Sequence, residues 1–471
     1  MKGVYSVAQV RAAEDAASAT SPDGVLMQRA ATALASECVR LLRARTGRVY
    51  GADVVVLIGS GNNGGDALYA GAALARRGAR VAALLVDDGR VHGAGLAALR
   101  AAGGRVGAQT PAPDLVIDGL LGIGGRGGLT GRAAELAETY ADVFTVAVDV
   151  PSGVETDTGY APGAAVQADV TVTFGCLKPG VVLGAGAELA GSVLLADIGL
   201  PLPTAECFVP EAHDIAALLP EPMAADDKYS RGVTGVAAGS AAYPGAAVLA
   251  TGAALHGGGM VRYAGHAAGG VGPRYPEVVV SEPDARVQAW VVGPGIGLDA
   301  DAVALLVAVL DSDVPVLVDA DAITLLAERP ELLARRSAPT VLTPHDREFA
   351  RIAPEAATLL ATNRLGAARA AAAALDAVVL LKGSATIVAD PGGTAYVNPT
   401  GTPWLATAGS GDVLAGYIGS LLASGLPAPL AAAAGAYVHG VAGQLAAADG
   451  PPTSADVLAA LRPAIHSVAL A

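Results

Sequence analysis

Short apolar runs recur along the first part of the chain, separated by alanine-rich stretches with helical periodicity. The runs predict strands at 53–58, 80–86, 114–118, 143–149, 169–174 and 193–197. Helices are predicted at 67–77 and 129–140, and an earlier helix opens at Ser6, where Gln9 completes a capping box. Continuous apolar strands that alternate with helices indicate a mostly parallel sheet covered on both faces.

The pattern breaks between about 199 and 227, where prolines cluster, and this break predicts a domain boundary. Strands then resume at 233–239, 288–293, 315–319, 340–343, 377–382, 385–389 and 394–397. Two long helical windows, 411–424 and 428–448, follow them. We therefore expect two α/β domains, 1–211 and 212–471, the second with a small β meander before its last helices.

Composition narrows the class of protein. Hydrophobic residues make up 52% of the 471 residues and charged residues only 16%, which is typical of a large, well-buried globular protein. A formal charge of -14 argues against a nucleic-acid surface. The separated cysteines Cys38, Cys176 and Cys207 suggest a reducing compartment, and we expect no signal peptide, no membrane span and a cytoplasmic location.

Polar and glycine-rich segments follow successive predicted strands. Residues 59–66, GSGNNGGD, come directly after strand 53–58 and lead into a helix, whose N-terminus favours phosphate. Asp118 precedes the glycine-rich loop 122–128, and Asp149 ends the next strand along the chain. Carboxyl ends of parallel strands meet at one edge of a sheet, so these segments predict a ligand site there.

These motifs, with Val150 to Gly153 and Phe174 to Lys178, resemble the epimerase domain of NAD(P)H-hydrate repair enzymes over residues 1–210. The resemblance implies a Rossmann-like three-layer α/β/α domain. It implies contacts to the hydrated dinucleotide from Asn62, Asn63, Gly64, Gly65, Asp66, Gly122, Ile123, Gly124, Gly125, Arg126, Gly127, Gly128 and Asp149. It also implies a potassium site at Asn63, Asp118 and Ser152, whose oxygen donors suit a hard cation. Ala67 stands where the family usually has glycine.

The chemistry implied is acid–base exchange of the hydroxyl at the hydrated nicotinamide carbon. We expect Asp149 to carry the proton and Lys178 to act as its electrostatic partner. Lysine is rare in this chain, with only Lys2, Lys178, Lys228 and Lys382 among 30 basic residues, so an internal lysine is a candidate for a specific role.

A second glycine-rich motif lies near the other end of the chain. Residues Gly409 to Asp412, GSGD, precede a helical window, which places amides and a carboxylate at a helix N-terminus. This arrangement suits phosphoryl transfer, with Asp412 accepting a hydroxyl proton. The sequence contains no Walker motif, so a P-loop kinase is disfavoured.

From about 219 to 471 the chain resembles the ribokinase-like superfamily and, more closely, the ADP- or ATP-dependent NAD(P)H-hydrate dehydratases. The matching segments include Lys228 to Gly232, Gly293 to Gly297, Asp319 to Ala322, Thr343 to His345, Lys382 to Thr386 and GSGD. The resemblance implies a ribokinase-like α/β/α domain, magnesium, and ADP as co-substrate. The implied hydrate contacts are Ala246, Gly295, His345 and Asp412, and the implied ADP contacts are Lys382, Gly383, Ser384, Ala385, Thr386 and Gly411.

Together the two resemblances imply an enzyme that epimerises hydrated NADH and NADPH and then dehydrates the S form, with release of AMP and phosphate. Asp346 and Arg347 replace the usual Pro-Gly before Glu348, so the role of that loop stays open. A ribokinase-like small-alcohol kinase with an accessory domain is the alternative, and a nucleotide-binding scaffold is a third. The sequence leaves the choice of hydrate, the choice of nucleotide and homo-oligomerisation open.

Overall fold

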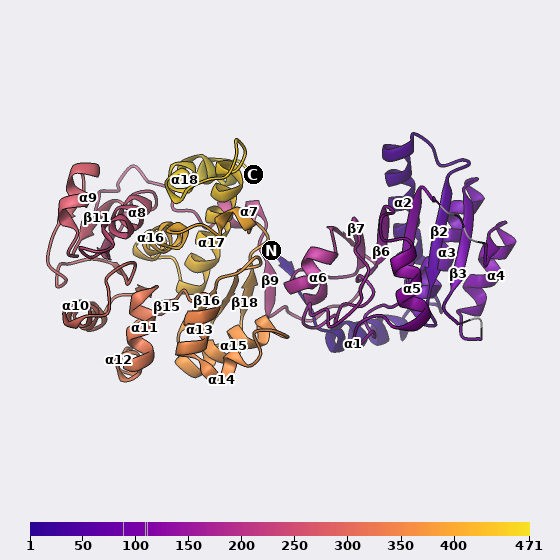
Figure 1. Ribbon diagram of the computed structural model, residues 1–471, viewed down its shortest axis with the longest axis horizontal. Helices are drawn as coiled ribbons and strands as arrows, with labels where there is room; N and C mark the ends of the chain where they lie inside the picture. Colours follow the sequence, from indigo (N-terminus) through magenta and orange to yellow (C-terminus); the bar gives the residue numbers. More distant parts are fainter. Residues whose placement is uncertain (88, 109, 111) are drawn as a thin grey trace. The chain divides into compact units, whose positions relative to one another are not determined.

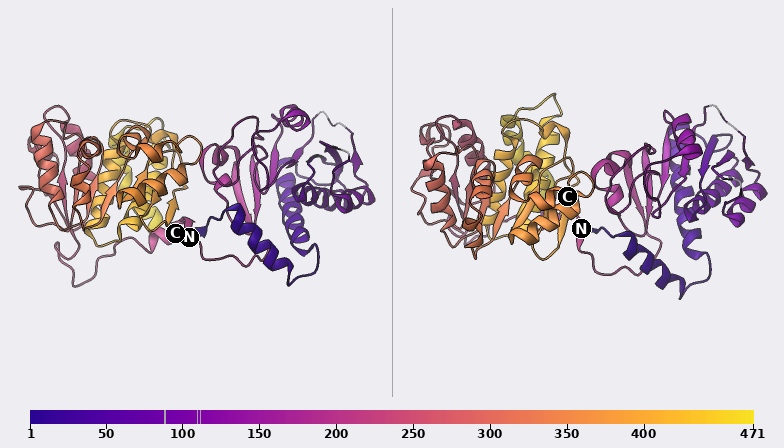
Figure 2. Two further views of the ribbon diagram at one scale, coloured as in Figure 1. Left: turned by 90° about the horizontal axis from the view of Figure 1, so that it is seen from below. Right: turned by 60° about the horizontal axis from the view of Figure 1, so that its bottom comes forward.

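The computed structural model describes residues 1–87, 89–108, 110 and 112–471 (Figures 1 and 2). The chain forms two compact units, Lys2–Glu206 and Cys207–Ala471, with Met1 belonging to the second. They are called the N-terminal unit and the C-terminal unit below. The division lies a few residues before the expected boundary between 211 and 212.

The N-terminal unit is a parallel α/β structure. Its helices are α1 (Val7–Ser18), α2 (Val25–Thr46), α3 (Asn62–Arg76), α4 (Gly93–Ala101), α5 (Gly131–Thr139) and α6 (Gly184–Leu189), with the 3-10 turn η1 (Pro179–Val181). Its strands are β1 (Lys2–Gly3), β2 (Asp53–Ile58), β3 (Arg80–Leu85), β4 (Arg105–Val106), β5 (Leu115–Gly119), β6 (Thr145–Val148), β7 (Val170–Phe174) and β8 (Ser192–Ala196).

Seven of these strands form a parallel sheet in the order β4-β3-β2-β5-β6-β7-β8. The strand order reverses at β2, which has β3 on one side and β5 on the other. Ligands bind at such a point, outside the carboxyl ends of the strands. The loops after β2 and β5 therefore meet where a ligand is expected.

Helices cover both faces of this sheet because its strands carry apolar side chains on both sides. Val54, Val56 and Ile58 of β2 pack into one buried core with α2, α3 and α4. Val55 and Leu57 belong to a second core with α5. Successive residues of a strand point to opposite faces, so one continuous apolar run serves both layers. The predicted three-layer arrangement is confirmed (Figure 1).

The C-terminal unit has a larger, mixed sheet. Its strands are β9 (Cys207–Val209), β10 (Val233–Ala237), β11 (Met260–Tyr263), β12 (Val279–Val280), β13 (Ala289–Val292), β14 (Val316–Val318), β15 (Thr340–Leu342), β16 (Val378–Leu381), β17 (Ile387–Ala389) and β18 (Ala395–Val397). They lie in the order β9-β18-β17-β16-β15-β14-β13-β10-β11-β12. Pairing is parallel from β12 to β16, whereas β16, β17 and β18 form the predicted antiparallel meander.

Helices cover this sheet on both faces as well. They are α7 (Ala212–Ala216), α8 (Pro244–Ala254), α9 (Ala268–Arg274), α10 (Ala300–Leu310), α11 (Asp321–Glu328), α12 (Glu331–Ala334), α13 (Asp346–Ile352), α14 (Pro354–Ala357), α15 (Arg364–Leu375), α16 (Ser410–Ala423), α17 (Ala428–Ala446) and α18 (Ser454–Ala469), with the 3-10 turn η2 (Pro403–Leu405). Val291 and Leu317 pack with α16, α17 and α18. Val292 and Val316 pack with α10 and α11 on the opposite face.

Part of the first glycine-rich motif lies inside a helix, which the sequence did not predict. The segment Asn62 to Asp66 forms the first turn of α3, although that helix was expected to begin at Ala67. In the second motif α16 begins at Ser410, close to the expected helical window 411–424. Glycine disfavours helix interiors but is acceptable in a first turn where close packing needs it. At Gly64 a Cβ would lie 2.5 Å from the carbonyl oxygen of Gly59, so only glycine fits.

Membrane-crossing segments were not expected, and the described helices agree with that. None of them is both long and apolar enough to traverse a bilayer. The segment from 427 to 448, predicted as a buried helix, is α17, and most of its residues are buried.

Candidate active sites

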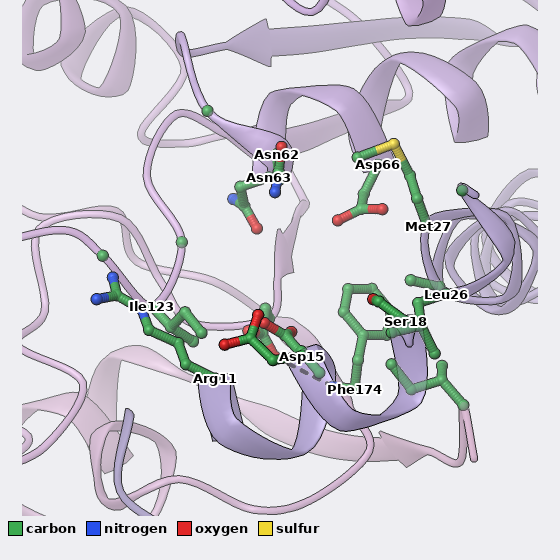
Figure 3. A pocket seen from close by; sticks show the side chains of 18 of the residues that line it. Arg11, Asp15, Ser18, Leu26, Met27, Asn62, Asn63, Asp66, Ile123 and Phe174 are labelled. Atoms are coloured by element: carbon green, nitrogen blue, oxygen red, sulfur yellow. Dashed lines mark hydrogen bonds between the residues drawn. The ribbon is translucent and has the colours of Figure 1, made fainter. Parts of the chain in front are cut away.

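A cavity of about 670 Å³ opens at the carboxyl ends of β2, β5 and β6 in the N-terminal unit (Figure 3). Helix α1 and the start of α2 line one side, and the first turn of α3 lines the other. The sequence-predicted residues on its wall are Asn62, Asn63, Asp66, Gly122, Ile123, Gly124, Gly125, Asp149 and Lys178. Gly64, Gly65, Arg126, Gly127 and Gly128 do not line it. The structure thus brings most of the expected epimerase residues to one cavity.

Asp149 and Lys178 form a buried ion pair at the edge of this cavity. The Lys178 ammonium donates to Asp149 Oδ1 at 2.5 Å, to the Phe174 carbonyl at 2.7 Å and to Thr173 Oγ1 at 3.0 Å. Thr173 Oγ1 and the Phe174 amide donate to the same Asp149 oxygen, at 3.0 and 3.1 Å. Oδ1 therefore takes three donors, while no hydrogen bond within the described chain reaches Oδ2.

The backbone of Asp149 is also unusual. Its φ is +68°, a conformation that costs a non-glycine residue free energy unless the surroundings hold it. The amide of Asp149 donates to the Val172 carbonyl at 2.8 Å, and its side chain is held by β7 as described above. These contacts fix the carboxylate at the end of β6, where it borders the cavity.

Two further carboxyl groups border the same cavity. Burial, with the charges of Asp149 and Glu14, raises the pKa of Asp66 to about 8. Burial, followed by the charge of Asp149, also raises the pKa of Glu14, which α1 supplies. Figure 3 shows the Asp66 carboxyl pointing from α3 into the cavity, on the side opposite Asp15 and Phe174. Asp66 therefore keeps its proton near neutral pH.

Asp118, Ser152 and Asn63, the predicted potassium ligands, cluster around Leu121. Asp118 is fully buried and accepts from the Ser152 hydroxyl at 2.7 Å and the Ser152 amide at 2.9 Å. The Asn63 amide donates to the Leu121 carbonyl at 3.0 Å, and the Ser152 hydroxyl lies 3.1 Å from the same oxygen. Burial raises the pKa of Asp118, and no basic side chain pairs with it within the described residues. A buried carboxylate among neutral oxygens fits a monovalent cation.

In the C-terminal unit, Lys382 lies at the centre of the candidate site, at the end of β16. Its ammonium donates to Asp319 Oδ1 at 2.8 Å and lies 3.9 Å from Glu348 Oε2. Thr343 Oγ1 donates to the same Asp319 oxygen at 2.8 Å. Burial lowers the pKa of Lys382, but the neighbouring carboxylates, Asp319 first, outweigh it, so the net shift is upward.

Asp412 lies in the first turn of α16, beside this group. Burial, followed by the charge of Asp319, raises the pKa of Asp412 to about 7, against the opposing effect of Lys382. A Cβ on Gly411 would lie 3.5 Å from the Lys382 ammonium and 3.8 Å from Asp319 Oδ2. The N-terminus of α16 therefore faces Lys382 closely, and its amides complete a site for an anion.

The other residues predicted for this site fall into two groups. Gly295 and Ala246 are neighbours, because a Cβ on Gly295 would lie 2.8 Å from that of Ala246. The turn of Gly383, Ser384, Ala385 and Thr386 joins β16 to β17, and Gly401 packs against the Ser384 carbonyl, where a Cβ would lie 2.1 Å away.

His345 is the N-cap of α13. Its Nδ1 accepts from the amides of Arg347 and Glu348 at 3.1 and 3.3 Å, and its own amide donates to Glu348 Oε2 at 2.9 Å. Asp346, one of the two departures from the family pattern, pairs with Arg364 at 2.9 Å, and Arg364 donates to the Lys382 carbonyl at 2.8 Å. Asp346 and Arg347 lie in the first turn of α13 rather than in a loop, and the Asp346–Arg364 pair connects this turn to the segment that follows β16.

Some site residues were not predicted from the sequence. Asp319 and Glu348 both lie beside the Lys382 ammonium. From the sequence, Asp319 could equally have been a residue that caps the end of a strand. Glu14 and Arg11 of α1 line the N-terminal cavity, and only the position of α1 beside that cavity reveals them. A signal for Asp319 was present, since it directly follows an apolar strand, as Asp118 and Asp149 do.

Comparisons with known proteins agree with both halves. A family model described as YjeF-related protein N-terminus matches residues 23–180, and one described as NAD(P)H-hydrate dehydratase matches residues 234–462. The bifunctional NAD(P)H-hydrate repair enzyme of Mycobacterium leprae is 53% identical over 97% of each chain. That of Mycobacterium tuberculosis strain H37Rv is 54% identical over 92% of each.

Among solved structures, the C-terminal part is similar to an ADP/ATP-dependent NAD(P)H-hydrate dehydratase from Bacillus subtilis, co-crystallized with ATP and Mg²⁺. The identity is 30% and the TM-score 0.50, over 55% of this chain and 97% of that chain. A ribokinase-like superfamily protein from Enterococcus faecalis, 24% identical with a TM-score of 0.52, shares the fold. With relatives above 50% identity over nearly its whole length, this chain belongs to the family of bifunctional NAD(P)H-hydrate repair enzymes.

Proposed function

We propose that the chain repairs hydrated NADH and NADPH in two steps. The N-terminal unit interconverts the R and S epimers of the hydrate, and the C-terminal unit dehydrates the S epimer with ADP, releasing AMP and phosphate. The observation that carries the proposal is the presence, on one chain of this family, of two strand-end sites that each combine a Lys–Asp pair with a carboxyl group of raised pKa. We assign the two activities to residues 1–211 and 212–471.

In the epimerase site, Asp149 exchanges a proton with the hydroxyl or water oxygen at the hydrated carbon of the nicotinamide ring. The ammonium of Lys178 and the donors from β7 occupy Oδ1, so Oδ2 is left for the substrate. The cavity wall from α3 and the loop after β5 holds the dinucleotide. The proposed contacts are Asn62 to Asp66 and Gly122 to Gly128, of which Gly64, Gly65 and Arg126 to Gly128 lie away from the cavity wall.

A potassium ion fits between Asn63, Asp118 and Ser152. Asp118 is a buried carboxylate whose described partners are neutral, so a cation there balances its charge. Asn63, Asp118 and Ser152 would hold the ion, which would supply positive charge to balance Asp118 beside the loop that follows β5. The residues themselves already connect β5 to the loop after β6 through the Ser152 hydroxyl.

In the dehydratase site, Asp412 accepts the proton of the substrate hydroxyl while a phosphoryl group passes to that oxygen from the nucleotide. The amides of α16 and the Lys382 ammonium face the negative charge of that group. The proposed nucleotide contacts are Lys382, Gly383, Ser384, Ala385, Thr386 and Gly411, and the proposed hydrate contacts are Ala246, Gly295, His345 and Asp412. Loss of phosphate, with a proton from the adjacent carbon, then restores the dihydronicotinamide.

Magnesium fits this site because carboxylates outnumber cations around Lys382. Asp319, Glu348 and Asp412 all interact with the single ammonium of Lys382. When bound with the nucleotide, magnesium would neutralise phosphate charge. We propose a cytoplasmic location, which the three buried free cysteines support, because such thiols persist in a reducing compartment.

One experiment tests both activities. Purified protein is mixed with both epimers of NADH hydrate, magnesium, potassium and either ADP or ATP, and the near-UV absorbance of the dihydronicotinamide is followed together with phosphate release. We expect full recovery from both epimers with the wild type. Asp149→Asn should recover only the fraction that begins as the S epimer, and Asp412→Asn should recover none. A stable phosphorylated product without recovery would instead indicate a small-alcohol kinase.

A further inference from the structure

The N-terminal cavity contains more carboxyl groups than the assigned chemistry uses. Asp149 has Lys178 as its ion-pair partner, whereas Asp66 and Glu14 form no ion pair among the described residues. Epimerisation, on which the following inference rests, moves a hydroxyl from one face of the ring to the other at a tetrahedral carbon that becomes planar when the hydroxyl leaves. One face needs a proton donor for the departing oxygen, and the other needs a proton acceptor for the incoming oxygen.

Asp66 has the geometry of the donor. It projects from the first turn of α3 into the cavity (Figure 3), and its Oδ1 is buried with no hydrogen bond from the described chain. A buried carboxylate oxygen without a donor is costly, whereas a protonated carboxyl without one costs much less. The groups that act on it are the carboxylates of Asp149 and Glu14, which with burial raise its pKa to about 8.

The other charged groups near Asp66 do not remove this proton. Lys178 is saturated by Asp149, Thr173 and Phe174, as described above. Arg11 and Asp15 are exposed on α1 and carry opposite charges. His92, packed against Gly65 behind the turn, accepts the Gly95 amide at Nδ1 and therefore has no proton on that nitrogen.

Asp149 has the complementary geometry of an acceptor. Its Oδ1 is fixed by three donors, one of them cationic, while Oδ2 receives no hydrogen bond from the described chain. It lies at the end of β6, whereas Asp66 lies on α3, so the two carboxyl groups approach one cavity from different elements. One cavity thus holds a candidate acid, Asp66, and a candidate base, Asp149.

We propose that Asp66 is the second catalytic residue of epimerisation, acting as the general acid opposite the Asp149 base. Asp66 gives its proton to the departing hydroxyl, the C–O bond breaks, and water leaves as the ring nitrogen lone pair forms a C=N bond. A water molecule on the other face loses a proton to Asp149 and forms the new C–O bond, while the C=N pair returns to nitrogen. Between turnovers in one direction, solvent water carries the proton from Asp149 back to Asp66. The reverse epimerisation uses the two residues in exchanged roles, so no external reagent is consumed.

The experiment compares epimerisation by the wild type, Asp66→Asn, Asp66→Glu and the control Asp142→Asn, an exposed aspartate just before β6. Initial rates are measured from each pure epimer by chromatography across pH 6 to about 9.5, in ¹⁸O-labelled water, with correction for uncatalysed exchange. We expect Asp66→Asn to lower kcat about 10²- to 10³-fold with KM changed less than about threefold. Asp66→Glu should recover part of the rate, and Asp142→Asn should match the wild type.

The pH profile and the label give independent readouts. The wild-type rate should fall above pH of about 8, as Asp66 loses its proton, and each inversion should introduce one oxygen from solvent. A wild-type rate in Asp66→Asn, an unchanged fall at high pH in that variant, or inversion without label would overturn the inference.

Folding of the N-terminal unit in Asp66→Asn is checked by far-UV circular dichroism and by its urea unfolding, which should match those of the wild type at pH 6, while ADP-dependent dehydration of the S epimer by the separate C-terminal unit should persist. A wild type that dehydrates the S epimer but never interconverts epimers would instead refute the proposed epimerase function itself.

Discussion

Each of the two sites contains a lysine paired with an aspartate at the end of a parallel strand. The two lysines differ in how many of their N–H donors are already used within the protein. Lys178 is 1% exposed, and its ammonium donates hydrogen bonds to Asp149, Thr173 and Phe174. Lys382 is 21% exposed and makes one hydrogen bond within the described residues, to Asp319. Lysine has three donors, so Lys382 keeps two for a ligand.

This difference matches the chemistry proposed for each unit. Lys178, whose three N–H donors are all used within the protein, positions the Asp149 carboxylate and has no donor left for a ligand. This suits a site in which Asp149 exchanges a proton. Lys382, which has unused N–H donors beside the N-terminus of α16, suits the binding of an anion such as a phosphoryl group. The second carboxyl group in each site, Asp66 or Asp412, has a raised pKa for the same physical reason, burial followed by a neighbouring carboxylate.

The largest expected effect separates the two activities. Asp412→Asn removes the proposed base and should lower ADP-dependent dehydration of the S epimer by about 10³-fold or more, because no other described group holds its place at the α16 N-terminus. Epimerisation by the same protein should stay within about twofold of the wild type, since the sites lie in separate units.

The matched control for that variant is Asp284→Asn, at an exposed loop position of the same unit, which should leave both rates unchanged. Dehydration by Asp412→Asn at more than a tenth of the wild-type rate would remove Asp412 from the mechanism. Both rates are obtained from single preparations by absorbance and chromatography.

The second prediction compares the two lysines as structural elements. Lys178→Met leaves Asp149 buried without its cation and should cost the N-terminal unit about 3–5 kcal/mol of unfolding free energy. Lys382→Met should cost the C-terminal unit less, about 1–2 kcal/mol, because Lys382 itself is 21% exposed and makes one described hydrogen bond rather than three, although the Asp319 carboxylate that remains is 2% exposed. Adding Asp149→Asn to Lys178→Met should recover much of the loss.

Urea unfolding distinguishes the two units. Both tryptophans, Trp290 and Trp404, belong to the C-terminal unit, so their fluorescence reports on that unit alone, while far-UV circular dichroism reports on both. Equal losses of unfolding free energy in the two lysine variants would show that the number of hydrogen bonds that each lysine makes within the protein does not affect stability.

The third prediction concerns pH and stability. An aspartate in an unfolded chain ionises near pH 4, whereas folded Asp412 keeps its proton to about 7 and folded Asp66 to about 8. Between these limits the folded state binds more protons, so the free energy of unfolding falls as pH rises. The contribution of Asp412 stops falling above pH of about 7, and that of Asp66 above pH of about 8.

Replacing either aspartate by asparagine removes this dependence. Each variant should therefore stabilise its own unit at pH 8.5 by about 1–2 kcal/mol and change it little at pH 4. Thermal unfolding across pH, followed by the probes described above, checks the result. Destabilisation at pH 8.5 would mean that the ionised carboxylate is favoured in the fold.

The sequence predicts the central strands of both sheets, because apolar runs such as 53–58 and 315–319 between turn signals are typical of buried strands. It omits short strands such as β4, β9, β11 and β12. It also misplaces the start of α3, since the glycines of NNGGD favour a loop locally and tertiary packing decides that they form a first turn, whereas the start of α16 lies close to the expected helical window 411–424. It also omits the long helix α2, whose N-cap, Gly24, gives no side-chain signal.

The residues of the two candidate sites could also be predicted only in part. Asp149, Lys178, Lys382 and Asp412 could be proposed from their motifs. The raised pKa of Asp66 and the place of Glu14 depend on which elements pack together, and no local pattern records that. Asp319 stood at a strand end like Asp149, but a strand-end aspartate is as often a cap as a ligand, and only the contact with Lys382 separates the two roles.

The smallest expected effect tests where backbone strain is stored. Among the described non-glycine residues of the N-terminal unit, the one with positive φ is the functional aspartate itself, Asp149, at +68°. In the C-terminal unit they are Asp376, at +47° after α15, and Ala320, at +51°, directly after Asp319 at the candidate site. Ala320→Gly should raise the unfolding free energy by about 0.5–1 kcal/mol, because relief of the strain exceeds the added entropy of the unfolded chain.

Dehydration by Ala320→Gly should stay within about twofold of the wild type. Thr343 and Lys382 donate hydrogen bonds to the Asp319 carboxylate, and the Asp319 amide donates one to the Val292 carbonyl, so the strained residue is not needed to hold Asp319 in place. Tryptophan fluorescence in urea and the absorbance assay measure the two quantities. A gain in stability with a tenfold loss of activity would show that the strain at Ala320 aims Asp319, and the two strand ends would then use strain in the same way.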